Sequence, residues 1–176
     1  MFGILEATSE RSAYSSWIKE QLETHRRAVD LGLDHCVKCG MCCMARPCIP
    51  TPHELEKIAD FLQLDLDDCI KQYFVIDKLG GEEQSFLFPA KETQKDITGT
   101  FVPWRRTYDR GNCIFFTEED GCKIYEVRPK MARESECWNE TDSKDLQMKA
   151  IEEWANLETP NKFQRWLDLA IEEFEY

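Results

Sequence analysis

The chain has 176 residues, 42% of them hydrophobic and 32% charged, so we expect one domain, 1–176, built around one core. Its 22 basic and 34 acidic residues give a net charge of −12, which repels phosphate backbones and anionic lipids and excludes nucleic acid as a partner. No uncharged stretch approaches the roughly 20 residues of a membrane span, so we expect no membrane association.

The N-terminal segment predicts a helix over residues 8–31. Trp17, Ile18, Leu22 and Val29 recur at helical spacing, and Gly32 follows as a natural stop. The first residues lack the basic start and apolar run of a signal peptide, so we expect a cytoplasmic location.

A second helix is predicted to begin after Thr51. The sequence Thr51-Pro-His-Glu54 is a capping box with proline at the first helical position. The face expected to be buried consists of Leu55, Ile58, Ala59 and Leu62. Asp65 begins another short helix, which would form a hairpin with the first and turn inward Leu66, Cys69, Ile70, Tyr73 and Phe74.

Short strands are predicted after residue 74. The segments 75–76, 86–88 and 101–104 have strand character, while Gly80-Gly81 indicates a turn and the polar stretch 91–96 a loop. Residues 112–125 predict a clearer hairpin, whose strands are joined through 118–121. We expect Cys113 to start the first strand of this hairpin and Cys122 to start the second.

The C-terminal part predicts two helices that pack on the protein's own core. The first would bury Leu146, Ala150, Trp154 and Leu157. Thr159-Pro160 supplies a cap and a first position for the second, which would bury Phe163, Trp166, Leu167, Ala170, Ile171 and Phe174. The expected fold is therefore α+β, mostly helical with a short β-hairpin, and it consists of an N-terminal helix (1–34), a cysteine-cluster core (35–140) and C-terminal helices (141–176).

The nine cysteines are the unusual feature of this composition. In a chain without an export signal, clustered thiols are more often metal ligands or redox catalysts than crosslinks. The run Cys36-x2-Cys39-Gly-Met-Cys42-Cys43 places four thiols within eight residues. Each C-x2-C turn can direct two sulfurs at one centre, and Gly40 relieves the backbone strain of that turn. Bacterial ferredoxins use the same repeated step for three ligands of one cubane.

Further cysteines are spread along the chain. Cys69 falls on a buried helix face and is expected to be a core residue. The other eight fit two four-coordinate sites, or one site with spare structural thiols, and are Cys36, Cys39, Cys42, Cys43, Cys48, Cys113, Cys122 and Cys137. Cys42 and Cys43 are adjacent, so their side chains diverge. We therefore expect these two cysteines to bind different metals, or to bridge two metals, rather than to bind a single ion together.

The donor set suits either iron–sulfur or zinc. The C-x2-C-x2-C pattern favours a 4Fe-4S cluster, with zinc as the alternative. Metal-bound thiolates leave a negative charge at the site, which nearby cations can offset. Four basic residues lie close to the cysteines in sequence and either have this role or are ordinary surface charges: Lys38, Arg46, Arg128 and Arg133. Histidines His35 and His53 are weaker candidates, because eight thiols are available.

Several separated motifs occur together in this chain. They are Cys36-x2-Cys39-Gly-Met-Cys42-Cys43, Pro52-x-Glu54, Cys113-x-Phe115-Phe116, Gly121-Cys122-x-Ile124-Tyr125-Glu-x-Arg128-Pro129 and Arg133. In this order they resemble the CxxCxxCC family, the YkgJ-type cysteine-cluster proteins described as zinc- or iron-chelating. The resemblance implies metal or cluster binding at Cys36, Cys39, Cys42, Cys43, Cys113 and Cys122.

One position departs from the family pattern. Family members usually read Arg-Pro-x-x-Cys-Arg, whereas this chain has alanine at Ala132, and Cys137 or Cys48 is expected to replace the missing thiol. The family is also similar to the flagellin lysine methylase, whose cysteine cluster is linked to S-adenosylmethionine-dependent methyl transfer. The C-x3-C-x2-C triplet typical of radical enzymes is broken here, because position 46 is Arg46.

Two classes of function follow. As a binding protein, the chain would hold one or two cysteine-bound centres and act in electron transfer, metal handling or maturation of a protein client. As an enzyme, it would keep an open metal position for methyl transfer or another redox step. A saturated thiolate shell favours the first class. Thiol–disulfide exchange ranks last, because the first C-x2-C follows a predicted helix instead of a strand.

Overall fold

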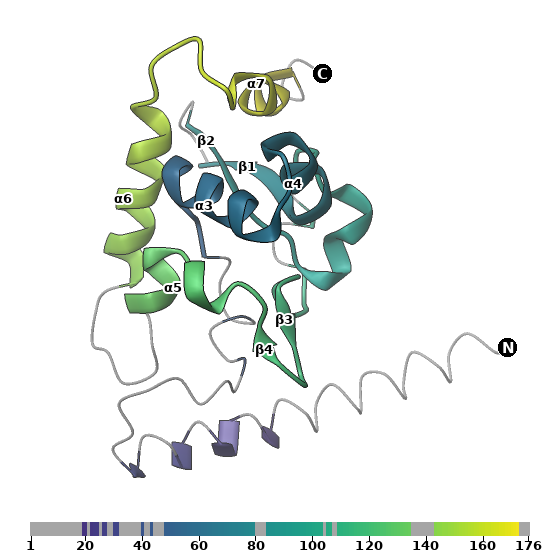
Figure 1. The fold of residues 1–176 in the computed structure, drawn as a ribbon, viewed down its shortest axis with the longest axis vertical. Helices are drawn as coiled ribbons and strands as arrows, with labels where there is room; N and C mark the ends of the chain where they lie inside the picture. The colour runs from purple at the N-terminus through teal and green to yellow at the C-terminus, as the bar shows by residue number, and fades with distance from the viewer. Residues whose placement is uncertain are drawn as a thin grey trace, which may run out of the picture.

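The computed structural model describes residues 48–79, 84–103, 105–106, 109–134 and 143–172, together with Gly40, Cys43 and parts of 19–31. In chain order, its elements are α3 (Pro52–Leu62), α4 (Leu66–Tyr73), β1 (Phe74–Lys78), β2 (Ser85–Pro89), the 3-10 helix η1 (Glu92–Ile97), β3 (Phe116–Thr117), β4 (Gly121–Cys122), the 3-10 helix η2 (Tyr125–Val127), α5 (Lys130–Glu134), α6 (Ser143–Ala155) and α7 (Gln164–Glu172). Helices and small antiparallel sheets are mixed, as expected for an α+β fold (Figure 1).

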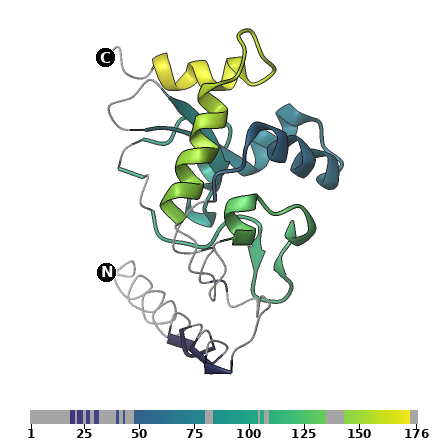
Figure 2. The same ribbon diagram turned by 90° about the vertical axis from the view of Figure 1, so that its left-hand side faces the viewer.

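The antiparallel pair β1–β2 forms the centre of this arrangement. Its register runs from Phe74 opposite Pro89 to Lys78 opposite Ser85. Helix α4 contacts β1, α6 contacts β2, and α7 contacts both strands. Figure 2 shows α6 along one side of the pair and α7 across one end, while the β3–β4 hairpin lies on the side of the pair away from α7.

Helix α3 begins with the predicted capping box. The Thr51 hydroxyl accepts the N–H of Glu54 at 3.3 Å, and the Glu54 carboxylate accepts the N–H of Thr51 at 2.9 Å. Leu55, Ile58 and Ala59 are buried, as the helical spacing predicts. The predicted helix start and these three buried positions are therefore confirmed, whereas Leu62, which was also expected to be buried, is only partly buried against the core.

Helix α4 begins at the predicted Asp65 cap, whose carboxylate accepts the N–H of Asp68 at 2.9 Å. Cys69 and Ile70 are buried on its inner face. The helix ends at Tyr73, and Phe74 already belongs to β1. The chain thus passes directly from a helix into the central sheet.

The C-terminal helices pack on the core, as predicted. The Trp154 indole lies edge-on to Phe163, with 5.0 Å between the ring centres, and its N–H donates to the Pro50 carbonyl at 2.7 Å. Trp166 donates to the Asp67 carboxylate at 3.1 Å. Both buried indoles therefore have a hydrogen-bond partner, and they fix α6 and α7 to segments about 100 residues earlier in the chain.

Three sequence predictions were wrong in detail. Residues 91–96 are not a loop, because η1 covers Glu92–Ile97. The segment 101–104 forms no named strand among the described residues, and Phe101 makes a single parallel bridge to Ile76. The last helix begins at Gln164 instead of Pro160, because the Asn161 carboxamide accepts the N–H of Phe163 at 2.9 Å and caps the chain there.

The described residues cover part of the predicted N-terminal helix and none of the predicted Gly80-Gly81 turn. Every described residue between Lys19 and Asp30 is helical, in agreement with the prediction for 8–31. Leu31 is a turn residue, so the helix ends one residue earlier than predicted, and the rest of that segment lies outside the described residues, as do both glycines of the turn.

Candidate metal centre

Two distant cysteine segments meet through a backbone hydrogen bond. The N–H of Cys113 donates to the carbonyl of Cys43 at 3.1 Å. Cys43 itself closes a turn, because its N–H donates to the Gly40 carbonyl at 3.0 Å. Cys43 is thereby placed directly against the segment that precedes β3.

Gly40 permits this turn for two reasons. Its φ of +71° lies in the left-handed region that glycine occupies without cost. A Cβ at this position would also lie 2.7 Å from the end of the Phe116 ring, which is too close for real carbon atoms. The sequence-based interpretation of Gly40 as the residue that relieves backbone strain is therefore confirmed.

Cys113 is held by the segment that follows β2. It forms an antiparallel bridge with Lys91, flanked by hydrogen bonds from the Ile114 N–H to Ala90 and from the Glu92 N–H to Asn112, each 2.9 Å long. Cys113 therefore does not start a strand, as was predicted, but lies three residues before β3. Its position is set by pairing with the chain beyond β2.

A buried polar network supports this pairing. The Gln94 side chain, which is fully buried, accepts the N–H of Lys91 at 2.9 Å and donates to the Arg106 carbonyl at 2.8 Å. Arg106 forms ion pairs with Asp96 at 2.7 Å and Asp109 at 2.9 Å. Hydrogen bonding to Arg106 lowers the pKa of Asp96 below its usual value. These contacts join η1 to residues 105–109, just before Cys113.

Cys122 lies at the end of β4, opposite Phe116 on β3, and does not start the strand as was predicted, because β4 begins at Gly121 and has only two residues. Gly121, the first residue of β4, follows the turn 118–120 directly and has a φ of +75°. Between the two cysteines, Phe115 stacks on Tyr73 with 4.9 Å between ring centres and lies 5.9 Å from Phe74. The hairpin that carries Cys122 is thus anchored to α4 and β1 by a buried aromatic side chain.

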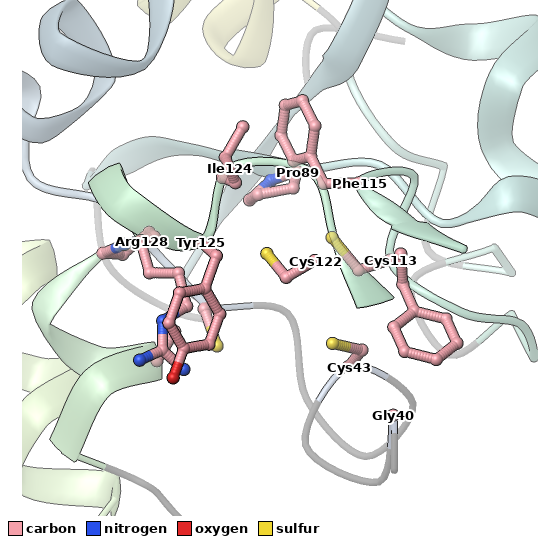
Figure 3. Close-up of a pocket in the computed structure, with 13 residues that line it drawn as sticks. Gly40, Cys43, Pro89, Cys113, Phe115, Cys122, Ile124, Tyr125 and Arg128 are labelled. Carbon is pink, nitrogen blue, oxygen red and sulfur yellow. The ribbon is translucent and has the colours of Figure 1, made fainter. Parts of the chain in front are cut away.

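The four cysteines Cys43, Cys48, Cys113 and Cys122 line one cavity of about 60 Å³. Figure 3 shows Cys43, Cys113 and Cys122 around the same space, with Tyr125 and Arg128 on another side of it. The other described lining residues are apolar, so no carboxylate is among them. They are Gly40, Pro89, Phe115, Phe116, Ile124, Pro129 and Ala132. Sulfur donors in an apolar setting suit zinc or iron–sulfur rather than magnesium or calcium.

The remaining predicted ligands cannot be placed. Cys36, Cys39, Cys42 and Cys137 lie outside the described residues, as do His35, Lys38 and Arg46. Within the part of the chain that is described, no three cysteine, histidine or acidic side chains are spaced to hold one metal ion. His53 is exposed in the first turn of α3 and does not line the cavity.

Cys69 is separate from this site. It is fully buried in the core, and burial raises the pKa of its thiol to about 12. A thiol with such a pKa stays protonated and is a poor metal ligand. Its interpretation as a core residue is confirmed.

The structure adds lining residues that the sequence did not indicate. Pro89, at the end of β2, lines the cavity although nothing in the cysteine spacing connects the two. Ala132, where the family pattern has a cysteine, lines it as well. Of the two cysteines expected to replace that thiol, Cys48 lines the same cavity.

A search for helices able to cross a membrane finds none long and apolar enough among the described residues. A comparison with solved structures gives no match. A curated relative, the uncharacterized protein MJ0661 of Methanocaldococcus jannaschii, is 33% identical over 100 residues, which are 56% of this chain and 42% of that protein. The chain thus spans about two-fifths of the length of the relative it matches.

The family comparison covers most of the sequence. Residues 35–154 match the model of a family described as a "Putative zinc- or iron-chelating domain". The match contains all eight cysteines expected to be ligands and all four that line the cavity. The chain belongs to the CxxCxxCC family.

Proposed function

We propose that this protein binds one or two 4Fe-4S clusters through its clustered cysteines. The observation that carries the proposal is the single cavity lined by Cys43 and Cys48 from one segment and Cys113 and Cys122 from another. The full proposed ligand set is Cys36, Cys39, Cys42, Cys43, Cys48, Cys113, Cys122 and Cys137. When bound, such a cluster supplies one-electron transfer, and the protein supplies the thiolates and a dry setting.

Iron–sulfur is chosen over zinc because of the cysteine run. Three cysteines joined by two successive C-x2 steps are the ferredoxin arrangement, whereas zinc sites are commonly built from two separate C-x2-C pairs. Zinc at the same thiols is the alternative, and it agrees equally with the description of the family.

The proposed role is electron transfer, metal handling or the maturation of a protein client in the cytoplasm. A closed thiolate shell leaves no position for a substrate. An enzymatic alternative is methyl transfer like that of the flagellin lysine methylase. One observation favours it, because Ala132 lines the cavity and provides no donor where a thiol is expected, which would leave the shell open.

Anaerobic purification of the full chain, followed by an optical spectrum and by iron, sulfide and zinc analysis, tests the proposal. We expect a brown protein with about four iron and four sulfide per cluster. Colourless protein with stoichiometric zinc would select the alternative. Protein that binds neither metal after reduction and reconstitution would refute both.

A further inference from the structure

Arg128 is the one charged side chain among the described residues that line the cysteine cavity. Its guanidinium carbon lies 3.8 Å from the centre of the Tyr125 ring. A cation so close to a ring face is held by cation–π attraction, so the position of this positive charge is fixed. Figure 3 shows both side chains beside the space that Cys43, Cys113 and Cys122 surround.

The backbone of Arg128 is also held in place. It follows η2 directly, and its carbonyl accepts a hydrogen bond from the Arg133 guanidinium at 2.5 Å. Arg133 lies 3.6 Å from the Glu54 carboxylate, which also accepts the N–H of Lys130 at 2.6 Å. Because Glu54 belongs to the capping box of α3, the arginine is attached to a well-anchored helix start.

The proposed centre requires a compensating charge. Thiolates bind metals in the deprotonated form, so four of them around a doubly positive ion or cluster core carry a net charge of about −2. Burying such a charge among apolar groups is costly, and the chain already has a net charge of −12. The guanidinium is the group best suited to offset it, because arginine stays protonated at every working pH.

In the part of the chain that the structure describes, the other cations considered near the cavity are engaged elsewhere or exposed to solvent. Arg133 pairs with Glu54, and Lys130 forms a 3.7 Å pair with Glu134. Lys123 follows Cys122 directly, but its side chain is exposed. Solvent screens such a charge far more than one in the cavity wall.

We infer that Arg128, held over Tyr125, is the cation that compensates the thiolate charge of the proposed centre and thereby strengthens metal binding. The inference rests on the proposed function and deepens it. Arg128 binds no metal in this scheme but acts on the thiolates through its charge.

Zinc ion is the probe for the test, because its affinity for the reduced full-length protein can be measured without assembling a cluster. Competition with a chromophoric chelator gives the apparent dissociation constant of wild type, Arg128→Gln, Arg128→Lys and the control Lys123→Gln. We expect Arg128→Gln to weaken binding about 10–100-fold, which is typical for the loss of a group that supports metal ligands. Arg128→Lys should recover most of this loss, and Lys123→Gln should change little.

Reduction of the iron-loaded protein gives a second readout. A nearby positive charge favours the more negative, reduced cluster, so Arg128→Gln should lower the reduction potential below the wild-type value. If Arg128→Gln does not fold, as judged by circular dichroism, Tyr125→Leu carries the test. This variant keeps the positive charge of Arg128 but removes the aromatic ring that holds it. We expect zinc binding weaker than in wild type, but by less than the roughly 10–100-fold expected for Arg128→Gln.

The outcomes separate this inference from the proposed function. Wild-type affinity in folded Arg128→Gln, or equal losses in Arg128→Gln and Arg128→Lys, would overturn the role of the charge while the metal site stands. An equal loss in Lys123→Gln would overturn it too, because any cation would then suffice. A wild-type protein that binds no zinc and no iron would overturn the proposed function itself.

Discussion

The N–H of Cys113 donates to the carbonyl of Cys43 at 3.1 Å, across 70 residues of sequence. This bond joins the cysteine run to the segment that leads into β3 and places two predicted ligands on one cavity. It turns two separate sequence motifs into parts of one site. Several measurable consequences depend on that arrangement.

If Cys43 and Cys113 serve the same centre, their replacements should not act independently. We expect Cys43→Ser and Cys113→Ser each to lose most of the bound iron or zinc, and the double variant to lose hardly more than either single one. Metal analysis of anaerobically purified proteins measures this. Additive partial losses would instead indicate two centres, one for each cysteine.

Replacing Gly40 should loosen the same site. Gly40→Ala forces a side chain into a φ of +71°, which costs about 1–2 kcal/mol, and brings its Cβ against Phe116. We expect weaker metal retention in a chelator challenge. The double variant Gly40→Ala with Phe116→Leu relieves the contact with the ring end but not the backbone strain, so it should recover only part of the loss. Full recovery would show that backbone conformation is unimportant here.

Local patterns in the sequence were sufficient for the starts of α3 and α4 and for the burial of Cys69. The capping box at Thr51 and the cap at Asp65 are short-range signals, and both helices begin where these residues predict. Cys69 was separated from the other thiols by its helical spacing alone.

Long-range pairing is what the sequence did not reveal. The bridge between Lys91 and Cys113 determines where β3 begins, and no local pattern relates those two segments. The same holds for Pro89 in the cavity wall and for the Asn161 cap that delays α7. These features depend on which segments meet in three dimensions, because backbone groups must find partners wherever the chain buries them.

The state of Cys69 can be checked by alkylation. Because burial raises the pKa of its thiol to about 12, only about one in ten thousand molecules carries the thiolate at pH 8. In metal-free, natively folded protein, we expect iodoacetamide to modify Cys43, Cys48, Cys113 and Cys122 well before Cys69. Peptide mapping by mass spectrometry measures the order, and denatured protein provides the control in which Cys69 reacts as well. Rapid native modification of Cys69 would contradict its burial.

The hydrogen bonds of the Gln94 side chain should contribute to the free energy of unfolding. Gln94→Leu leaves the Lys91 N–H without its partner, and an orphaned buried group costs about 1–3 kcal/mol, whereas the Arg106 carbonyl still accepts the N–H of Asp109 at 3.0 Å. We expect a clear fall in the urea midpoint. Gln72→Leu is the same substitution at an exposed position of α4 and should have little effect. Equal midpoints for the two variants would show that the network is dispensable.

Asp77 in β1 should make stability depend on pH. Burial raises the pKa of its carboxyl above the usual 3.8, although the Lys78 N–H, which donates to it at 2.8 Å, acts in the opposite direction. The folded chain therefore holds this proton more tightly than the unfolded chain. The free energy of unfolding contributed by Asp77 falls as pH rises from 3.8 through the folded pKa, and the cost is complete above it.

Asp77→Asn removes that cost while keeping an oxygen that accepts the Lys78 N–H. We expect the variant to unfold at higher urea than wild type at pH 7, and the difference to shrink as the pH approaches 4. Asp60→Asn removes one charge at an exposed position of α3 and controls for the general relief of a chain with net charge −12. An advantage of Asp77→Asn that is the same at both pH values, or is matched by Asp60→Asn, would mean that the burial of Asp77 is not its cause.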